Sequence, residues 1–86
     1  MKHAGSAALD DLKDVLVAVR AIEGLRERKR GAFYRGAVAF LHFHEDPAGP
    51  FADLKVASGW ERTRVRTAAE RRSLVARAAR AAKGAR

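Results

Sequence analysis

The sequence has no cysteine among its 86 residues, which excludes disulfides, thiolate metal sites and a cysteine nucleophile. It has no apolar run close to the eighteen or so residues that span a membrane. The first residues lack the basic and then apolar pattern of a signal peptide. There is also no Gly-rich phosphate loop, serine nucleophile motif or paired-carboxylate signature. We therefore expect a cytoplasmic bacterial protein that is not an enzyme and uses no cofactor.

The hydrophobic content of 48% is typical of a folded protein and predicts a single domain over residues 1–86. A chain of this size buries only about 60–65% of its unfolded surface, so association into a dimer would add useful burial. We expect residues 1–5 and 84–86 to be frayed tails.

Positive charge is the most unusual property of the chain, and it is unevenly distributed. The net charge is +8, of which residues 25–36 contribute +4 and residues 67–86 contribute +5. Such an excess attracts nucleic acid, anionic lipid and acidic proteins, and it selects poorly among them.

Two segments have the periodicity of amphipathic helices. In residues 6–24, apolar residues recur at steps of three and four, with Ser6 as the expected N-cap and Gly24 as the expected stop. In the second segment, Thr67 and Glu70 have the spacing of a capping box, and Gly84 ends the pattern. The apolar stripes are Leu9, Leu12, Leu16, Val19 and Ile22 in the first helix, and Leu74, Val75, Ala78, Ala81 and Ala82 in the second.

Between these helices the hydrophobic period changes to two, which predicts strands. The basic block Arg26–Arg30 is expected to be a solvated connection or the exposed start of a strand. The four predicted strands are Ala32–Tyr34, Val38–His44, Phe51–Ala57 and Trp60–Arg66, joined through Arg35–Gly36, Asp46–Pro50 and Ser58–Gly59. A sheet with one apolar face needs a cover, so we predict an α+β two-layer sandwich. Its order is helix, four-stranded antiparallel meander, helix, with both helices on one sheet face.

The facing pattern predicts a register and an outward surface. Leu41 and Phe43 should lie beside Leu54 and Ala52 on the covered side, which sets His42 opposite Asp53. A two-residue turn at Ser58–Gly59 would then set Asp53 opposite Arg64 and Lys55 opposite Arg62. The predicted outward residues are Phe40, His42, His44, Asp53, Lys55, Trp60, Arg62 and Arg64, with Phe33 beside them.

The leading functional prediction is binding of nucleic acid or another polyanion, such as an acidic protein. Outward arginines would contact phosphates and exposed aromatic rings would stack on bases. Three arginines of the second helix, Arg72, Arg77 and Arg80, would extend the basic surface. Two other interpretations remain open: the charged pairs only keep the face solvated, or the chain homodimerises through Phe40 and Trp60.

A third interpretation is a metal site. His42 and His44 project on the same side of a strand, and Asp53 would add a carboxylate, a ligand set that suits zinc or non-haem iron. The neighbouring arginines oppose a cation. His42 and Asp53 also resemble a base and its orienting group, but no nucleophile accompanies them.

The segments AFYRG, FLHFHEDPAG and FADLKV, between Gly31 and Val65, resemble small bacterial α+β proteins of unknown function. At the level of the fold, the helix–antiparallel sheet–helix order is similar to frataxin-like and YjbR-like domains. Iron binding in frataxin-like proteins depends on an acidic helix ridge. The first helix here has only Asp10, Asp11, Asp14 and Glu23, and the whole chain has the opposite sign of charge.

Overall fold

The structure, a computed structural model that describes residues 1–84, has the predicted α+β architecture. Its elements in chain order are β1 (Lys2–His3), α1 (Ser6–Asp11), α2 (Lys13–Arg20), β2 (Arg26–Lys29), β3 (Ala32–Arg35), β4 (Val38–Asp46), β5 (Gly49–Val56), β6 (Gly59–Arg64) and α3 (Ala68–Gly84). The strands pair antiparallel in the order β2-β3-β4-β5-β6, and β1 pairs with β4 beyond the end of β3. The predicted four-stranded meander is therefore β3–β6, and β2 and β1 extend the sheet on its β3 side.

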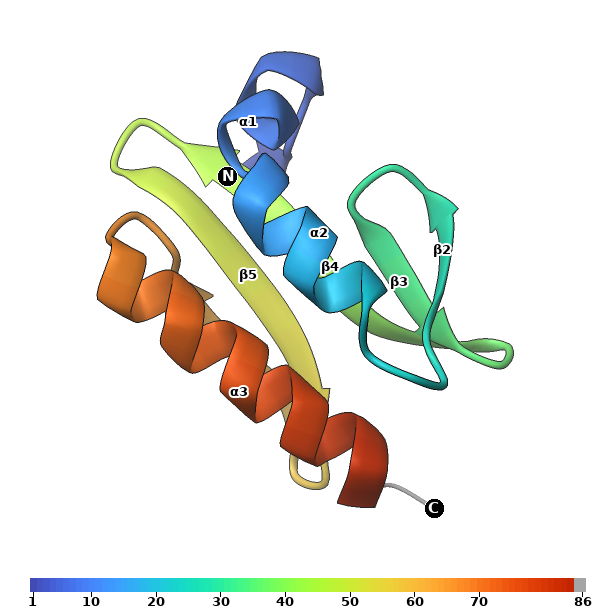
Figure 1. Cartoon of the computed structure of the whole chain (residues 1–86). Helices are drawn as coiled ribbons and strands as arrows, with labels where there is room; N and C mark the ends of the chain where they lie inside the picture. Colours follow the sequence, from blue (N-terminus) through green and yellow to red (C-terminus); the bar gives the residue numbers. More distant parts are fainter. Residues whose placement is uncertain (85–86) are drawn as a thin grey trace.

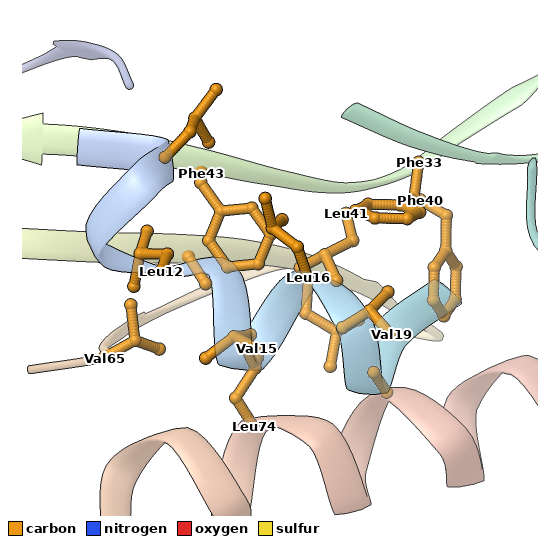
Figure 2. Packing of buried hydrophobic residues seen from close by; sticks show 14 of the residues in the cluster. Leu12, Val15, Leu16, Val19, Phe33, Phe40, Leu41, Phe43, Val65 and Leu74 are labelled. Atoms are coloured by element: carbon orange, nitrogen blue, oxygen red, sulfur yellow. The ribbon is translucent and has the colours of Figure 1, made fainter. Parts of the chain in front are cut away.

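Helices α2 and α3 lie side by side over one face of the sheet, as predicted (Figure 1). Their buried residues join those of the strands in a single hydrophobic cluster (Figure 2). The cluster consists of Leu9, Leu12, Val15, Leu16, Val19, Phe33, Phe40, Leu41, Phe43, Ala52, Leu54, Val65, Leu74, Ala78 and Ala82. Every one of these side chains is removed from water on the helix side, so the other sheet face is left without a cover.

The N-terminal residues are more ordered than the predicted frayed tail. Lys2 and His3 form β1, opposite Glu45 and His44 of β4. Two further bonds anchor this end: the Ala4 N–H donates to the Phe43 carbonyl at 3.0 Å, and the Gly5 N–H donates to a carboxylate oxygen of Glu45 at 2.6 Å. Backbone pairing, which needs no apolar side chain, holds these residues, and hydrophobic periodicity therefore gave no sign of it.

The single helix expected over residues 6–24 is two helices with a break at Leu12. Gly5 is the N-cap of α1 and makes no side-chain cap bond, so the prediction that Ser6 caps the helix was wrong. Gly24 does have a positive φ of 92°, but α2 ends four residues earlier, at Arg20. The apolar stripe was predicted correctly because the break preserves the buried side of both helices.

A β-bulge in β4 changes which side Phe40 faces. Phe33 pairs with Leu41, whereas the next residue, Tyr34, pairs with Ala39, so Phe40 is the extra residue of β4. Phe40 and Leu41 are consecutive, yet both are buried, at 3% and 0% exposure. The bulge interrupts strict alternation. The predictions that Phe40 and Phe33 face outward were therefore wrong, and both belong to the core (Figure 2).

The pairing of β4 with β5 was predicted correctly, including Leu41 opposite Leu54 and His42 opposite Asp53. The pairing of β5 with β6 differs by two residues. The turn consists of residues 57–58, and Gly59, with a φ of 129°, begins β6. Asp53 consequently lies opposite Arg62, not Arg64. Because the shift is two residues, each side chain keeps its predicted face.

The remaining ends of the elements follow local chemistry. The predicted loop Asp46–Pro50 shrinks to a turn at residues 47–48, because Gly49 and Pro50 already belong to β5. The basic block forms the edge strand β2. The capping box is confirmed: the Glu70 N–H donates to the Thr67 hydroxyl at 3.1 Å, and the Glu70 carboxylate accepts from the Thr67 N–H at 2.9 Å. Helix α3 ends at Gly84, and the rest of the predicted C-terminal tail, residues 85–86, lies outside the described residues.

Candidate binding surface on the open sheet face

The face of the sheet opposite the helices is called the open face here. Alternation along the strands and the contacts between its side chains define its members. They are His3 from β1, Tyr34 from β3, His42 and His44 from β4, Phe51, Asp53 and Lys55 from β5, and Trp60, Arg62 and Arg64 from β6. Seven of the eight residues predicted for the binding surface lie on this face. Six of them are neighbours near its middle: His42, His44, Asp53, Lys55, Trp60 and Arg62. The seventh, Arg64, lies opposite Phe51 at the end of β6. Phe40 does not belong to this face.

Three rings form a row across the open face. The ring centroids of Tyr34 and His42 are 6.5 Å apart, and those of His42 and Trp60 are 5.3 Å apart with a tilt of 30°. Trp60 is 48% exposed, so much of its ring is available to a ligand. We call Tyr34, His42 and Trp60 the ring row.

A cation lies against each end of the ring row. The guanidinium carbon of Arg28 is 4.7 Å from the centroid of the Tyr34 ring, and the ammonium of Lys55 is 5.5 Å from the centroid of the Trp60 ring. Both distances are within the range of cation–π attraction. The row is therefore an aromatic platform bounded by positive charge.

His3 brings a third imidazole to the open face. Its ring centroid is 4.8 Å from that of His44 and 6.0 Å from that of His42. Partial burial lowers the pKa of His42 below its usual value, and the neighbouring His3 and His44 lower it further, while Asp53 acts in the opposite direction. At neutral pH, His42 therefore contributes an uncharged ring to the row.

Asp53 is the one carboxylate at the centre of this surface. The Arg62 guanidinium donates two hydrogen bonds to it, at 2.7 and 2.8 Å, and these bonds hold the pKa of the Asp53 carboxyl below its usual range. His44 Nε2 lies 3.0 Å from the second oxygen, but the ring nitrogen does not have hydrogen-bond geometry toward it. The contact with His44 is thus electrostatic proximity, and Arg62 is the principal partner of Asp53.

The predicted metal ligands do not fit a metal ion in this arrangement. Within residues 1–84, no group of three or more histidine, cysteine or carboxylate side chains is placed to hold one. Asp53 also has both oxygens engaged by Arg62. His42 and His44 lie on one face as predicted, but Arg62 of β6, which would repel a metal ion, is paired with Asp53 beside them.

The three α3 arginines that were predicted to extend the basic surface, Arg72, Arg77 and Arg80, lie on the helix side of the sheet and so do not extend the open face. Arg77 is half-buried and already engaged: it donates to Glu61 at 2.6 Å and to the Thr63 hydroxyl at 3.0 Å. Arg72 is exposed beside the groove between α2 and α3, and Arg80 is exposed near the C-terminal end of α3. One flat ligand cannot contact these side chains and the open face together.

Sequence reasoning missed two residues of the surface: His3 was assigned to a tail, and Tyr34 was placed in a short strand without a facing. Arg28 was expected only as one of several arginines and lysines of the basic block, without a contact to Tyr34. The period-two pattern through residues 26–35 is too short to fix a facing, and only the pairing of β2 with β3 sets it.

Comparison with known proteins assigns no family or activity: no family model matches the chain, and neither a curated protein nor a solved structure matches it. Among the described residues, no helix has the length and apolar character needed to cross a membrane.

Proposed function

We propose that this protein binds single-stranded nucleic acid on its open face. The observation that carries the proposal is the ring row of Tyr34, His42 and Trp60 with a cation at each end. Bases stack on exposed aromatic rings whatever their identity, and arginine or lysine side chains beside the rings neutralise the phosphates between them.

The charges of the open face support a polyanionic ligand. Lys55 is exposed beside Trp60, and Arg64 is exposed with its Nε 3.6 Å from a Glu70 oxygen, a distance typical of a weak surface pair. Arg62 keeps half of its side chain exposed while it neutralises Asp53. The face therefore offers phosphate contacts, and its central carboxylate is already compensated.

A single strand fits this face better than a duplex. A duplex hides the faces of its bases and is read by an element that enters a groove. The ring row instead crosses neighbouring strands on an uncovered face, with successive rings tilted by 53° and 30°, and its exposed ring surface can meet unstacked bases. We therefore expect preference for single-stranded over double-stranded oligonucleotides, with little sequence specificity.

The test is fluorescence anisotropy with labelled single- and double-stranded oligonucleotides of one sequence, measured across a salt series. Loss of one stacked base in Trp60→Ala should weaken single-strand binding about 5- to 150-fold, the range that corresponds to 1–3 kcal/mol. Arg64→Ala should weaken binding and flatten the salt dependence. Arg72→Ala is the matched control, since it removes the same charge from an exposed position on the helix side.

The proposal would be refuted if the protein did not bind oligonucleotides at low salt. It would also be refuted if Trp60→Ala and Arg72→Ala lost the same affinity for the single strand. The alternative use of the same face is homodimerisation, which the 48% exposure of Trp60 favours. In that case, Trp60 fluorescence would shift on dilution of the protein without nucleic acid, and sedimentation would show a dimer.

A further inference from the structure

A hollow on the helix side of the fold has a different chemistry from the open face. It lies where the end of α3 meets the β3–β4 turn and the β5–β6 turn, and its volume is about 620 Å³. This volume is within the range of small-molecule sites. The lining residues are Arg35, Val38, Phe40, Lys55, Val56, Ala57, Arg80, Ala81 and Gly84.

The walls of the hollow are mostly apolar. Phe40 forms part of them because the bulge in β4 turns its side chain inward. Val56 and Ala81 are half-buried against the core, and Val38 is 58% exposed. A β-branched side chain with this exposure gains contacts if an apolar group enters beside it.

The rim of the hollow is positive. Arg35, Lys55 and Arg80 contribute three cations, and no carboxylate side chain is among the lining residues. Arg80 forms no ion pair within residues 1–84 and is exposed to solvent. An apolar wall with a cationic rim is complementary to an apolar chain that ends in one negative charge.

We propose that this hollow binds a fatty acyl carboxylate, with its chain against Phe40, Val56 and Ala81 and its carboxylate beside Arg80. A nucleic acid fits the hollow poorly, because most of its contact area is apolar while a phosphate chain is charged along its whole length. A neutral alkane would give no partner to the charge of Arg80, which forms no ion pair within residues 1–84. The hollow and the ring row share one side chain, Lys55, which lines the hollow and lies 5.5 Å from the Trp60 ring centroid. The carboxylate is placed beside Arg80, which the ring row does not use.

The test is titration of the ¹⁵N-labelled protein with decanoate, kept below its micelle concentration, and followed by amide chemical shifts. Saturable shifts at Phe40, Val56 and Ala81, with little change at Tyr34 and Trp60, are the expected result. Arg80→Glu should weaken decanoate binding by about tenfold, as expected for loss of one charge-assisted contact. Arg72→Glu, the same charge reversal on an exposed position of α3, should leave the affinity within about twofold.

Decanol and decyltrimethylammonium serve as ligand controls with the same chain and a different head. Weaker binding of decanol, and weaker still of the cation, would support recognition of the carboxylate. Equal binding of all three would show an unselective apolar patch and overturn the proposal. It would also be overturned by shifts confined to the open face, or by equal effects of Arg80→Glu and Arg72→Glu. Since Arg80 is exposed, both variants are expected to fold, and far-UV circular dichroism will check this.

Discussion

Replacement of Phe40 by alanine tests the bulge on which both surfaces depend. Phe40 is 3% exposed, and phenylalanine-to-alanine changes in a core cost about 3–5 kcal/mol. The neighbouring hollow gives the surroundings room to relax, so we expect a loss near the lower limit, about 3 kcal/mol. For a domain of this size, that corresponds to a fall in Tm of about 12–24 °C.

The expected loss is a large part of the total stability. At 0.05–0.15 kcal/mol per residue, a chain of this length has an unfolding free energy of about 4–13 kcal/mol. Phe40→Ala can therefore leave a partly unfolded protein. Phe40→Leu keeps most of the apolar volume and should lower the free energy of unfolding by about 1 kcal/mol. Its unfolding can therefore be measured even if Phe40→Ala is partly unfolded.

The assay is urea unfolding followed by far-UV circular dichroism. Trp60→Ala is the matched control, since it removes a larger ring from the open face, where it is 48% exposed. We expect it to cost about 1 kcal/mol or less. If Phe40 faced outward, as strict alternation predicts, the two alanine variants would behave alike. If the two variants lost the same free energy of unfolding, or if Phe40→Ala lost less than about 1 kcal/mol, Phe40 could not be buried as the bulge requires.

Two further predictions concern pH and a glycine. The pKa of His42 is lower in the folded than in the unfolded chain, so below about pH 6.5 the unfolded chain binds the proton first and stability falls. The Tm should drop between pH 7.5 and 5.5, and His42→Gln should flatten that dependence; an unchanged slope would contradict this. Gly31→Ala should destabilise more than Gly24→Ala in urea, since both have positive φ but only the added Cβ at Gly31 would lie 2.6 Å from a Leu9 methyl. We expect a difference of about 1 kcal/mol, and equal urea midpoints would show that Leu9 yields freely.

The fold could be predicted because its main determinants are periodic. The apolar stripes of the helices and the alternation in the middle of β4 and β5 each repeat several times, so a break at Leu12 did not obscure the pattern. The pairing of β4 with β5 followed from matching two apolar faces. Each of these predictions uses several residues that agree with one another.

The features that could not be predicted each depend on one or two residues. Strand β1 has only Lys2 and His3, and backbone pairing holds it in place. The β5–β6 register depends on whether the turn includes Gly59 or ends before it. Both registers leave each side chain on the same face of the sheet, so the apolar pattern cannot choose between them. The bulge at Phe40 depends on the β3–β4 pairing, which has no local signature in an apolar run.

The composition of the candidate surface followed the same division. Residues in the regular parts of β4, β5 and β6, such as His42, Lys55 and Trp60, were predicted with the correct facing. The residues assigned to the wrong face were Phe40 and Phe33, which lie beside the β-bulge. The sequence did not decide whether the arginines of the sheet face and those of α3 share one surface. That depends on how α3 packs on the sheet.

The bulge in β4 accounts for both proposed sites at once. By turning Phe40 inward, it supplies the aromatic wall of the hollow. It also brings Ala39, rather than a bulky side chain, opposite Tyr34 on the other side of the sheet. A phenyl ring at that position would cover the approach to the Tyr34 end of the ring row, whereas the alanine methyl leaves it open. One inserted residue thus places an aromatic ring in the wall of the hollow and leaves a small side chain beside the ring row on the open face.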